Sequence, residues 1–443
     1  MLKNLYNLYL KNFITTENGF IFFKFGILFL PTLPFISGIL LLISSIFGTI
    51  NRTESFLKDK YNYPFVAIGI LMIISCLRTE FVSAENVNSS LNWISLINWL
   101  PFFWFFWSFK SYLKSEKLRT ICANYFIFGS IPLLISGLIQ YFFKWYGPFE
   151  FFNGLIIWYL RPICAASGEN ICVTGLTGFF NNPNITGSYL AILVPFSLYF
   201  LTRSIKKKST SRIFYLIILL SILISIFLTT SRNAWLGAII SFLIFFNKSW
   251  IFLALFFLLS VSLPLLINNI NFIPENIKIL LDDFVPYNLR SKFLNFGFNN
   301  INNYPRFSFF DTAIKMIFSK PLFGWGATMY TIVYEMKNSS YSGHPHNLIL
   351  ELAINYGIFA ALIFAIYVIW LIKKSIQLIK EKRKHSKPLI DKAFYASLIV
   401  ILITHLFDIP YYDVRISICF WILIASMRGI IFEIETEKPK ELL

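Results

Sequence analysis

Uncharged, strongly apolar runs recur along the whole chain and are separated by short polar segments. A run of roughly 15–25 residues, coiled as an α-helix, can cross the hydrocarbon core of a bilayer. The runs are continuous and do not alternate between apolar and polar residues, which excludes a transmembrane β-barrel. After a first long run, the pattern predicts spans at residues 64–77, 91–109, 120–143, 184–202, 213–230, 232–247, 249–267, 347–372, 393–408 and 415–432.

The first apolar run, from Phe20 to Phe47, is longer than one span requires and contains Pro31 and Pro34. Proline lacks a backbone N–H and breaks or kinks a helix interior. The run is therefore either one long helix or a helical hairpin broken at the prolines. The two alternatives differ in the side of the membrane on which each later loop lies.

Positive charge in the loops favours the hairpin, because cytoplasmic loops are enriched in Lys and Arg. With the long loop 268–346 left aside, one alternate set of loops carries 21 Lys and Arg, and the other set carries five: Arg78, Lys144, Arg161, Arg232 and Arg415. We place the basic set in the cytoplasm, and the N-terminal segment with it, because that segment carries Lys3, Lys11 and Lys24. Because the N-terminal segment and loop 48–63 then lie on the same side, an even number of spans must precede residue 48. This favours the hairpin and gives about twelve helices in total. The basic set comprises residues 48–63, 110–119, 203–212 and 373–392 together with Lys248.

We therefore expect an all-α, polytopic membrane protein in which residues 1–443 form a single integral membrane domain. Two loops on the non-cytoplasmic side, residues 144–183 and 268–346, are long enough to suggest a function. Within the second loop, residues 305–318 are predicted to form an amphipathic helix that lies along the membrane surface or roofs a cavity. Its apolar face is expected to comprise Phe307, Phe310, Ile314, Ile317 and Phe318.

Composition supports this assignment and excludes other classes. Of the 443 residues, 56% are hydrophobic and 14% are charged, and the mean hydropathy is +0.65. A soluble fold could not bury so much apolar surface, and the chain is neither disordered nor collagen-like. The net charge of +17 is first a signal of topology. No soluble segment combines a basic tract with interleaved aromatic residues, so we expect membrane lipids as partners and no nucleic acid.

The five cysteines offer one candidate cross-link. Cys164 and Cys172 lie in loop 144–183 with seven residues between them. In an oxidising compartment they can form a disulfide that pins the loop, and the alternative is two free thiols. No Cys or His spacing suits zinc, so no metal site is expected. The remaining cysteines are expected to pack as apolar side chains in or near spans: Cys76, Cys122 and Cys419.

The segment His344-Pro345-His346-Asn347 closes the long loop at the start of the next predicted span. An imidazole at a membrane–water boundary can act as a general base near neutral pH. The alternative is a polar residue that caps the helix, with His346 or Asn347 at the cap. Glu351, one turn further on, either stabilises the helix N-terminus or orients His346.

Two arginines are candidates for binding an anion on the non-cytoplasmic side, where His346 is also predicted to lie. Arg232 stands between two apolar helices and Arg306 opens the amphipathic helix. A guanidinium group suits the paired oxygens of a diphosphate. The alternatives are snorkelling of Arg232 beside Trp235 and an exposed loop charge at Arg306.

Further along, His405 is expected to have a structural role within its span. Three charged residues are expected to pair with each other: Asp408, Asp413 and Arg415.

Four segments, in this order, resemble the O-antigen ligase and O-antigen polymerase superfamily of bacterial inner-membrane glycosyltransferases. The resemblance covers about residues 170–375, nearly half of the chain. The N-terminal third is similar only in hydropathy. The segments are Phe179-Phe180-Asn181-Asn182-Pro183-Asn184, Ser231-Arg232-Asn233-Ala234-Trp235-Leu236, Arg306 through Gly326, and His346-Asn347 followed by Leu348-Ile349-Leu350-Glu351-Leu352.

The resemblance implies transfer of a glycan from undecaprenyl diphosphate to a hydroxyl of a lipid or glycan acceptor, on the periplasmic face of the inner membrane, without metal or cofactor. It assigns Arg232 and Arg306, with His344 beside them, to substrate binding, and His346 to activation of the acceptor. Ligases and polymerases share these segments, so both stay open. Cyanobacterial relatives once named bicarbonate transporters share the Arg-Asn-Ala-Trp pattern, which leaves a small-anion transporter as the third alternative.

Overall fold

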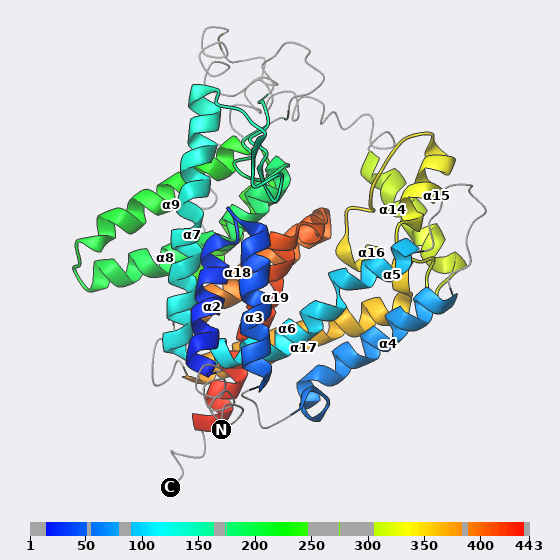
Figure 1. The fold of residues 1–443 in the computed structure, drawn as a ribbon, viewed down its shortest axis with the longest axis horizontal. Coiled ribbons are helices and arrows are strands. Elements are labelled where there is room, and N and C mark those ends of the chain that lie inside the picture. Colours follow the sequence, from blue (N-terminus) through cyan, green and yellow to red (C-terminus); the bar gives the residue numbers. More distant parts are fainter. Residues whose placement is uncertain are drawn as a thin grey trace, which may run out of the picture. The chain divides into compact units, whose positions relative to one another are not determined.

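The computed structural model describes residues 15–50, 55–78, 90–163, 173, 175–246, 274, 305–382 and 389–437. These residues are mainly helical, and their one two-stranded sheet is an antiparallel hairpin in which Phe149 pairs with Trp158 (Figure 1). Its strands are β1 (Phe149–Phe151) and β2 (Ile156–Trp158). The chain divides into two compact units, Met1–Ser130 with Pro305–Leu443 and Ile131–Tyr304.

Seven described helices are long and apolar enough to cross a membrane, which confirms the prediction of an all-α, polytopic fold. Two further apolar helices, Pro34–Ile50 and Arg232–Phe246, are shorter. The predicted span 249–267 lies outside the described residues, so the total of twelve helices stays a prediction. The seven segments are Lys60–Arg78, Glu116–Phe143, Pro183–Lys206, Ser211–Leu228, Ile358–Glu381, Leu389–Phe407 and Val414–Thr436.

The first apolar run forms two helices, as the hairpin alternative predicted. Helix α2 (Thr16–Phe29) ends before Pro31, and α3 (Pro34–Ile50) begins at the second proline. The two helices pack closely, because Gly26 has no side chain to keep Leu41 away. The Ser37 hydroxyl donates a hydrogen bond to the Gly26 carbonyl at 2.7 Å, which holds the start of α3 against α2.

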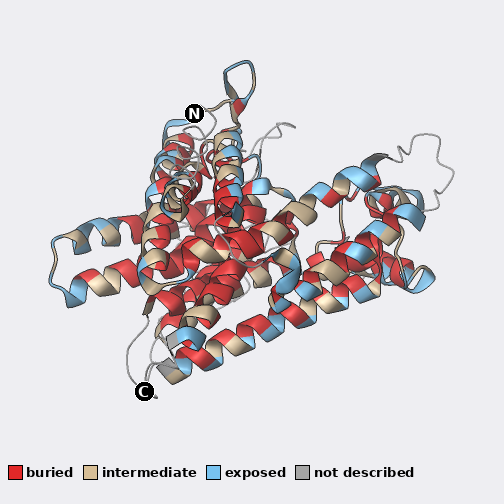
Figure 2. Ribbon diagram, turned by 60° about the horizontal axis from the view of Figure 1, so that its bottom comes forward, coloured by how far each residue is buried: buried red, intermediate tan, exposed pale blue. Residues whose placement is uncertain are grey.

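Helix α19 (Val414–Glu437) forms the centre of the first unit, and nearly all of its span is buried (Figure 2). It packs against α6 (Leu100–Leu113), α17 (Ile358–Lys382) and α18 (Leu389–Phe407). Trp421 of α19 is fully buried and lies 5.2 Å from Phe65 between ring centroids. Large aromatic rings therefore fill the space between these helices, as expected from their high content in the chain.

The predicted span 347–372 is wrong in one respect, because it consists of two helices. Helix α16 (Leu348–Tyr356) ends at Gly357, and α17 begins at the next residue. Gly357 has φ of +92°, and a side chain there would collide with the Leu322 carbonyl. The segment around Pro321 crosses the break and accepts the Ile358 N–H at 2.8 Å. Hydrophobicity alone cannot report such a break, because the sequence stays apolar across it.

The second unit is built around α8 (Pro183–Lys206), which packs against both α9 (Ser211–Leu228) and α10 (Arg232–Phe246). Asn182 caps α8 by accepting the Asn184 N–H at 2.8 Å. Gln140, near the end of α7 (Glu116–Phe143), accepts the N–H groups of Thr177 and Gly178 at 3.1 and 3.0 Å. The start of α8 is thus fixed within the unit by side-chain hydrogen bonds.

Arg119 of α7 is fully buried in the first unit and ties four helices together. Its Nε donates to Asp391 Oδ1 of α18 at 2.8 Å, and Nη1 donates to the Leu113 carbonyl of α6 at 2.8 Å. Its Nη2 lies 2.5 Å from Glu433 Oε2 of α19. One guanidinium group therefore compensates two acidic groups from different helices.

Replacing Arg119 with Met should strongly destabilise the first unit, because Asp391 and Glu433 would be left without their cation. Breaking a buried ion pair in this way costs about 3–5 kcal/mol. We expect a lower midpoint of thermal unfolding in detergent. The matched control is Lys315→Met, which removes an exposed ion pair with Asp311 at 2.9 Å and should leave the midpoint almost unchanged. Equal midpoints for the two variants would contradict this role of Arg119.

Candidate functional site

The candidate site is assembled at the start of α16. Asn347 caps this helix, because its side-chain oxygen accepts the N–H groups of Ile349 and Leu350 at 3.0 and 3.1 Å. His346 precedes the cap and has φ of +55°, a left-handed conformation that is uncommon for histidine. The cap prediction is thus confirmed for Asn347, and the His346 side chain is available for another contact.

The partner of His346 is Asp408, the residue that follows α18. The distance between His346 Nδ1 and Asp408 Oδ1 is 3.1 Å, and the same carboxylate oxygen accepts the Ile409 N–H at 2.9 Å. An ionised carboxylate can only accept, so this contact places the imidazole proton on Nδ1. The neutral ring then carries its lone pair on Nε2, the atom that a general base would use.

His344 supports the same arrangement from the other side. Its Nδ1 accepts the backbone N–H of His346 at 3.2 Å, and the two rings meet edge-on with centroids 4.3 Å apart. This bond stabilises the unusual backbone conformation of His346. Because Nδ1 of His344 accepts, the proton of the neutral ring lies on Nε2, which is 3.9 Å from Asp408 Oδ1.

The electrostatics of the three side chains favour a charged Asp408 beside a neutral His344. Burial, together with a smaller effect of the neighbouring His346, lowers the pKa of His344 to about 4 against the opposite effect of Asp408. Burial alone would raise the pKa of Asp408. The hydrogen bond and charge of His346, with a smaller effect of His344, outweigh burial and hold this pKa below its ordinary value. Any stability that Asp408 contributes is therefore present above pH 3.8 and is lost only as the pH falls through its lower folded pKa.

The same three residues are the described group that could hold a metal ion, because their ligand atoms lie within 4.8 Å of one another. The hydrogen bonds argue against that use. A metal at His344 Nε2 would require the proton to move to Nδ1, which would break the bond from the His346 N–H. The donor set in this arrangement therefore fits proton transfer better than metal binding.

Helix α14 (Pro305–Ser319) covers the imidazole of His346, which confirms the predicted helix in the long loop. Phe309 stacks on the His346 ring, with centroids 4.9 Å apart and planes inclined by 26°. The same helix carries half-buried Arg306 one turn before Phe309. The fold thus brings Arg306 onto the element that touches His346.

The predicted apolar face of α14 is only partly correct. The inner face comprises Thr312, Ala313, Met316 and Ile317. Three residues assigned to that face, Phe307, Ile314 and Phe318, are exposed instead. Both sides of this helix are rich in apolar residues, so periodicity could not identify the buried one.

Arg232 begins α10 in the second unit and is exposed. The adjoining Trp235 is buried, and its indole N–H donates to the Ile226 carbonyl at 3.1 Å. This anchors the start of α10 to α9 within the unit. Because Arg232 lies in a different unit from His346, the predicted meeting of these two side chains stays a prediction. The predicted disulfide between Cys164 and Cys172 falls outside the described residues.

One of the two alternatives for Glu351 is excluded, and one prediction about acidic residues is wrong. Glu351 does not orient His346, because its Oε1 accepts from Asn355 and Tyr412 instead. Asp408 does not join the ion pair of Asp413 with Arg415. The available signal was that Asp408 ends a span on the same predicted side as His346. Nothing in the sequence connected two residues 62 positions apart.

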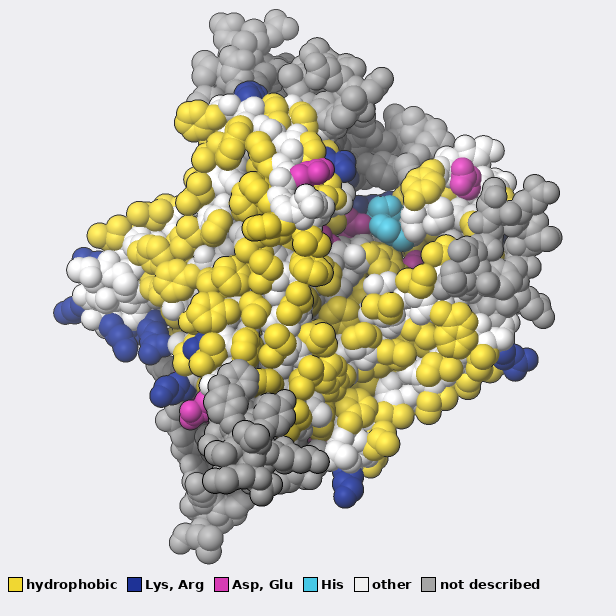
Figure 3. All heavy atoms as spheres, in the orientation of Figure 1, with side chains coloured by type: hydrophobic (Ala, Val, Ile, Leu, Met, Phe, Trp, Pro, Cys, Tyr) yellow, Lys and Arg dark blue, Asp and Glu magenta, His cyan; other side chains and the backbone are white. Residues whose placement is uncertain are grey.

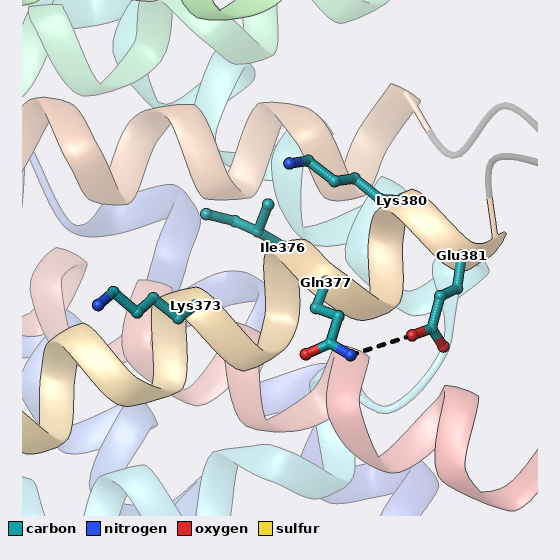
Figure 4. Close-up of a pocket in the computed structure, with 5 residues that line it drawn as sticks. All are labelled: Lys373, Ile376, Gln377, Lys380 and Glu381. Carbon is teal, nitrogen blue, oxygen red and sulfur yellow. Dashed lines mark hydrogen bonds between the residues drawn. The ribbon is translucent and has the colours of Figure 1, made fainter.

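The surroundings also distinguish this cluster from the rest of the surface. Among the described histidines, His405 is buried, whereas His344 and His346 are partly exposed. Figure 3 shows histidine surface with acidic side chains beside it. Hydrophobic side chains cover most of the described surface on that face (Figure 3). A separate hollow of about 460 Å³ lies on α17 at Lys373, Ile376 and Lys380, where the Gln377 amide donates to Glu381 at 3.2 Å (Figure 4). It contains no histidine and is not the candidate site.

The described helices define a multi-pass membrane protein with a polar cluster between α16 and α18. Residues 216–365 match the family described as O-antigen ligase, which confirms the resemblance to the O-antigen ligase and polymerase superfamily over that segment. The match covers about a third of the chain and includes Arg232, Arg306 and His346. Nothing among the curated proteins matches the chain. The family and the apolar helices together support a membrane glycosyltransferase of the ligase or polymerase kind.

The low pKa of His344 predicts a loss of stability in mild acid. The folded pKa of about 4 lies below the ordinary value of 6.5, so the unfolded chain binds more protons between these two pH values. Stability should fall as the pH drops through that window. In His344→Gln this part of the slope should disappear, as measured by the midpoint of thermal unfolding across the window. Identical slopes for the variant and the natural protein would contradict the assignment.

Proposed function

We propose that this protein transfers a glycan from undecaprenyl diphosphate to an acceptor hydroxyl on the periplasmic face of the bacterial inner membrane, as an O-antigen ligase does. The observation that carries the proposal is the contact between His346 and Asp408 inside a chain that matches the ligase family. A positioned imidazole whose tautomer is set by a carboxylate is the usual arrangement of a general base.

In the proposed reaction, His346 Nε2 takes the proton of the acceptor hydroxyl while its oxygen attacks the anomeric carbon of the glycan. The bond between that carbon and the diphosphate oxygen breaks, and the configuration at the carbon inverts. Asp408 stabilises the imidazolium that forms, because its negative charge lies against Nδ1. The diphosphate leaves with the electron pair of the broken bond, so both charge and atoms balance without a further reactant.

The departing diphosphate needs positive charge, and Arg306 and Arg232 are proposed to supply it. Arg306 is favoured by its place on α14, the helix whose Phe309 stacks on His346. Guanidinium groups bind two phosphate oxygens at once, which stabilises charge that develops in the transition state. For Arg232 the support is the family match and its predicted side of the membrane. His344 is proposed to hold the backbone of His346 rather than to touch the glycan.

Replacing His346 with Ala should abolish glycan transfer while the protein still folds and inserts. Loss of a general base lowers turnover about 10²–10⁴-fold. The assay is transfer from a polyprenyl-diphosphate glycan in proteoliposomes, with Lys315→Met as the control variant. Full transfer by His346→Ala would refute the assignment of the base.

Replacing Arg306 or Arg232 with Lys should slow turnover although the charge is kept, because an ammonium cannot reproduce two parallel hydrogen bonds. Losing a charged hydrogen bond of about 1.5–3 kcal/mol corresponds to a reduction of roughly 10–100-fold. Arg212→Lys, on the exposed surface near the start of α9, is the matched control. Unchanged turnover in both arginine variants would contradict their role in diphosphate binding.

The product separates the two family activities. A ligase leaves the glycan on a new acceptor, whereas a polymerase leaves a longer glycan on the polyprenyl carrier. Analysis of the carrier-bound and acceptor-bound fractions after one incubation therefore distinguishes them. Uptake of an anion into vesicles, without consumption of lipid-linked glycan, would instead favour a transporter.

A further inference from the structure

The segment that carries Asp408 is tied to α16 at both ends. The Asn347 side-chain amide donates to the Leu406 carbonyl at 3.2 Å, two residues before Asp408. The Tyr412 hydroxyl lies 2.7 Å from Glu351 Oε1, four residues after Asp408. Because His346 directly precedes α16, these two contacts set where Asp408 stands relative to the imidazole.

Glu351 is in an unusual position for an acidic residue. It is 5% exposed, and no cation forms an ion pair with it among the described residues. Its Oε1 accepts from the Asn355 amide at 2.8 Å as well as from Tyr412. Its Oε2 has no hydrogen-bond partner within the described part of the chain, and neither has Asn355 Oδ1. A buried carboxylate ion with an unsatisfied oxygen is costly.

The two unsatisfied atoms belong to side chains that already share one hydrogen bond. A proton on Oε2 would turn that oxygen from an acceptor into a donor, and the acceptor it needs is available on the same neighbour, Asn355 Oδ1. The carboxylic acid and the amide would then form a ring of two hydrogen bonds, and Oε1 would still accept from Tyr412. A proton on Oε2 would remove the buried charge, and closing this ring would give both atoms a partner.

We propose that Glu351 is a positioning residue, held as the neutral acid by Asn355, which fixes Asp408 against His346 through Tyr412. This inference rests on the proposed function for its effect on turnover, whereas the protonated state of Glu351 does not depend on it. The hydrogen bonds of Glu351 go to Asn355 and Tyr412 and not to His346, so its proposed effect is on the geometry of the Asp408 segment. The anionic partner of the imidazole stays Asp408, and a second buried negative charge close by is avoided.

The decisive comparison is between Glu351→Gln and Glu351→Ala. Glutamine has the shape of the protonated acid, with an N–H₂ group in place of the O–H, so Glu351→Gln should keep at least half of the natural kcat. Glu351→Ala and Tyr412→Phe should lower kcat about tenfold or more with little change in KM, because a misplaced catalytic group slows chemistry rather than binding. A defect in Glu351→Gln as large as that in Glu351→Ala would overturn the neutral acid.

A double-mutant cycle tests whether Glu351 acts through Asp408. In an Asp408→Asn background, adding Glu351→Ala should cost little more, because the interaction it positions has already been removed. A merely structural role would instead lower kcat by the same factor in both backgrounds, and that result would overturn the positioning role. Tyr411→Phe is the control for Tyr412→Phe, because the Tyr411 hydroxyl donates to the Asn98 carbonyl and accepts from the Trp421 indole N–H, and has no hydrogen bond to Glu351.

An infrared measurement separates this inference from the proposed function. The C=O stretch of a protonated carboxylic acid should be present at neutral pH, disappear in Glu351→Gln and persist in Tyr411→Phe. Its absence from the natural protein would overturn the neutral acid whether or not the protein transfers glycans. If the band is present but no glycan transfer is detected, the protonated state of Glu351 is supported and only the proposed function is refuted.

Discussion

The hydrogen bond between His346 and Asp408 is the interaction on which the candidate site depends. It joins the start of α16 to the end of α18, so it is formed only when both helices are in place. It also decides the tautomer of the imidazole and therefore which nitrogen can accept a proton. The backbone N–H of His346 donates to His344 Nδ1, which fixes the backbone, and Phe309 stacks on the imidazole ring. The site is thus preorganised by backbone, ring and carboxylate contacts together.

Burial of polar groups in an apolar protein explains why so many side chains near the site have more than one partner. Water cannot satisfy a donor or acceptor inside the helices, so each polar group needs a protein partner. Asn347 both caps α16 and holds the Leu406 carbonyl. Asp408 accepts from a backbone N–H and contacts the imidazole through the same oxygen. In the first unit the buried Arg119 side chain likewise has several protein partners, namely two acidic residues and one backbone carbonyl.

Most of the fold could be predicted from hydrophobicity because the bilayer imposes it. An apolar run without charge must satisfy its backbone internally, and a helix is the way to do so. The prolines at 31 and 34 therefore located the turn between α2 and α3 correctly. The break at Gly357 could not be found, because it arises from a segment beginning near Pro321 that crosses the helix from elsewhere in the chain. The buried face of α14 was misjudged for a similar reason, since only its neighbours decide which apolar side is covered.

By itself the sequence determined the membrane class, most of the helix positions and the chemical types at the site, because these follow from local composition and short spacings. It identified His346 and Arg306 as candidates through residue type and context. Only the tertiary structure decided that Asp408, and not Glu351, is the partner of the imidazole. That pairing joins residues 62 positions apart, and it depends on how two helices end beside each other. Short-range patterns carry no information on such a contact, because the distance between helix ends is set by side-chain packing across the whole unit.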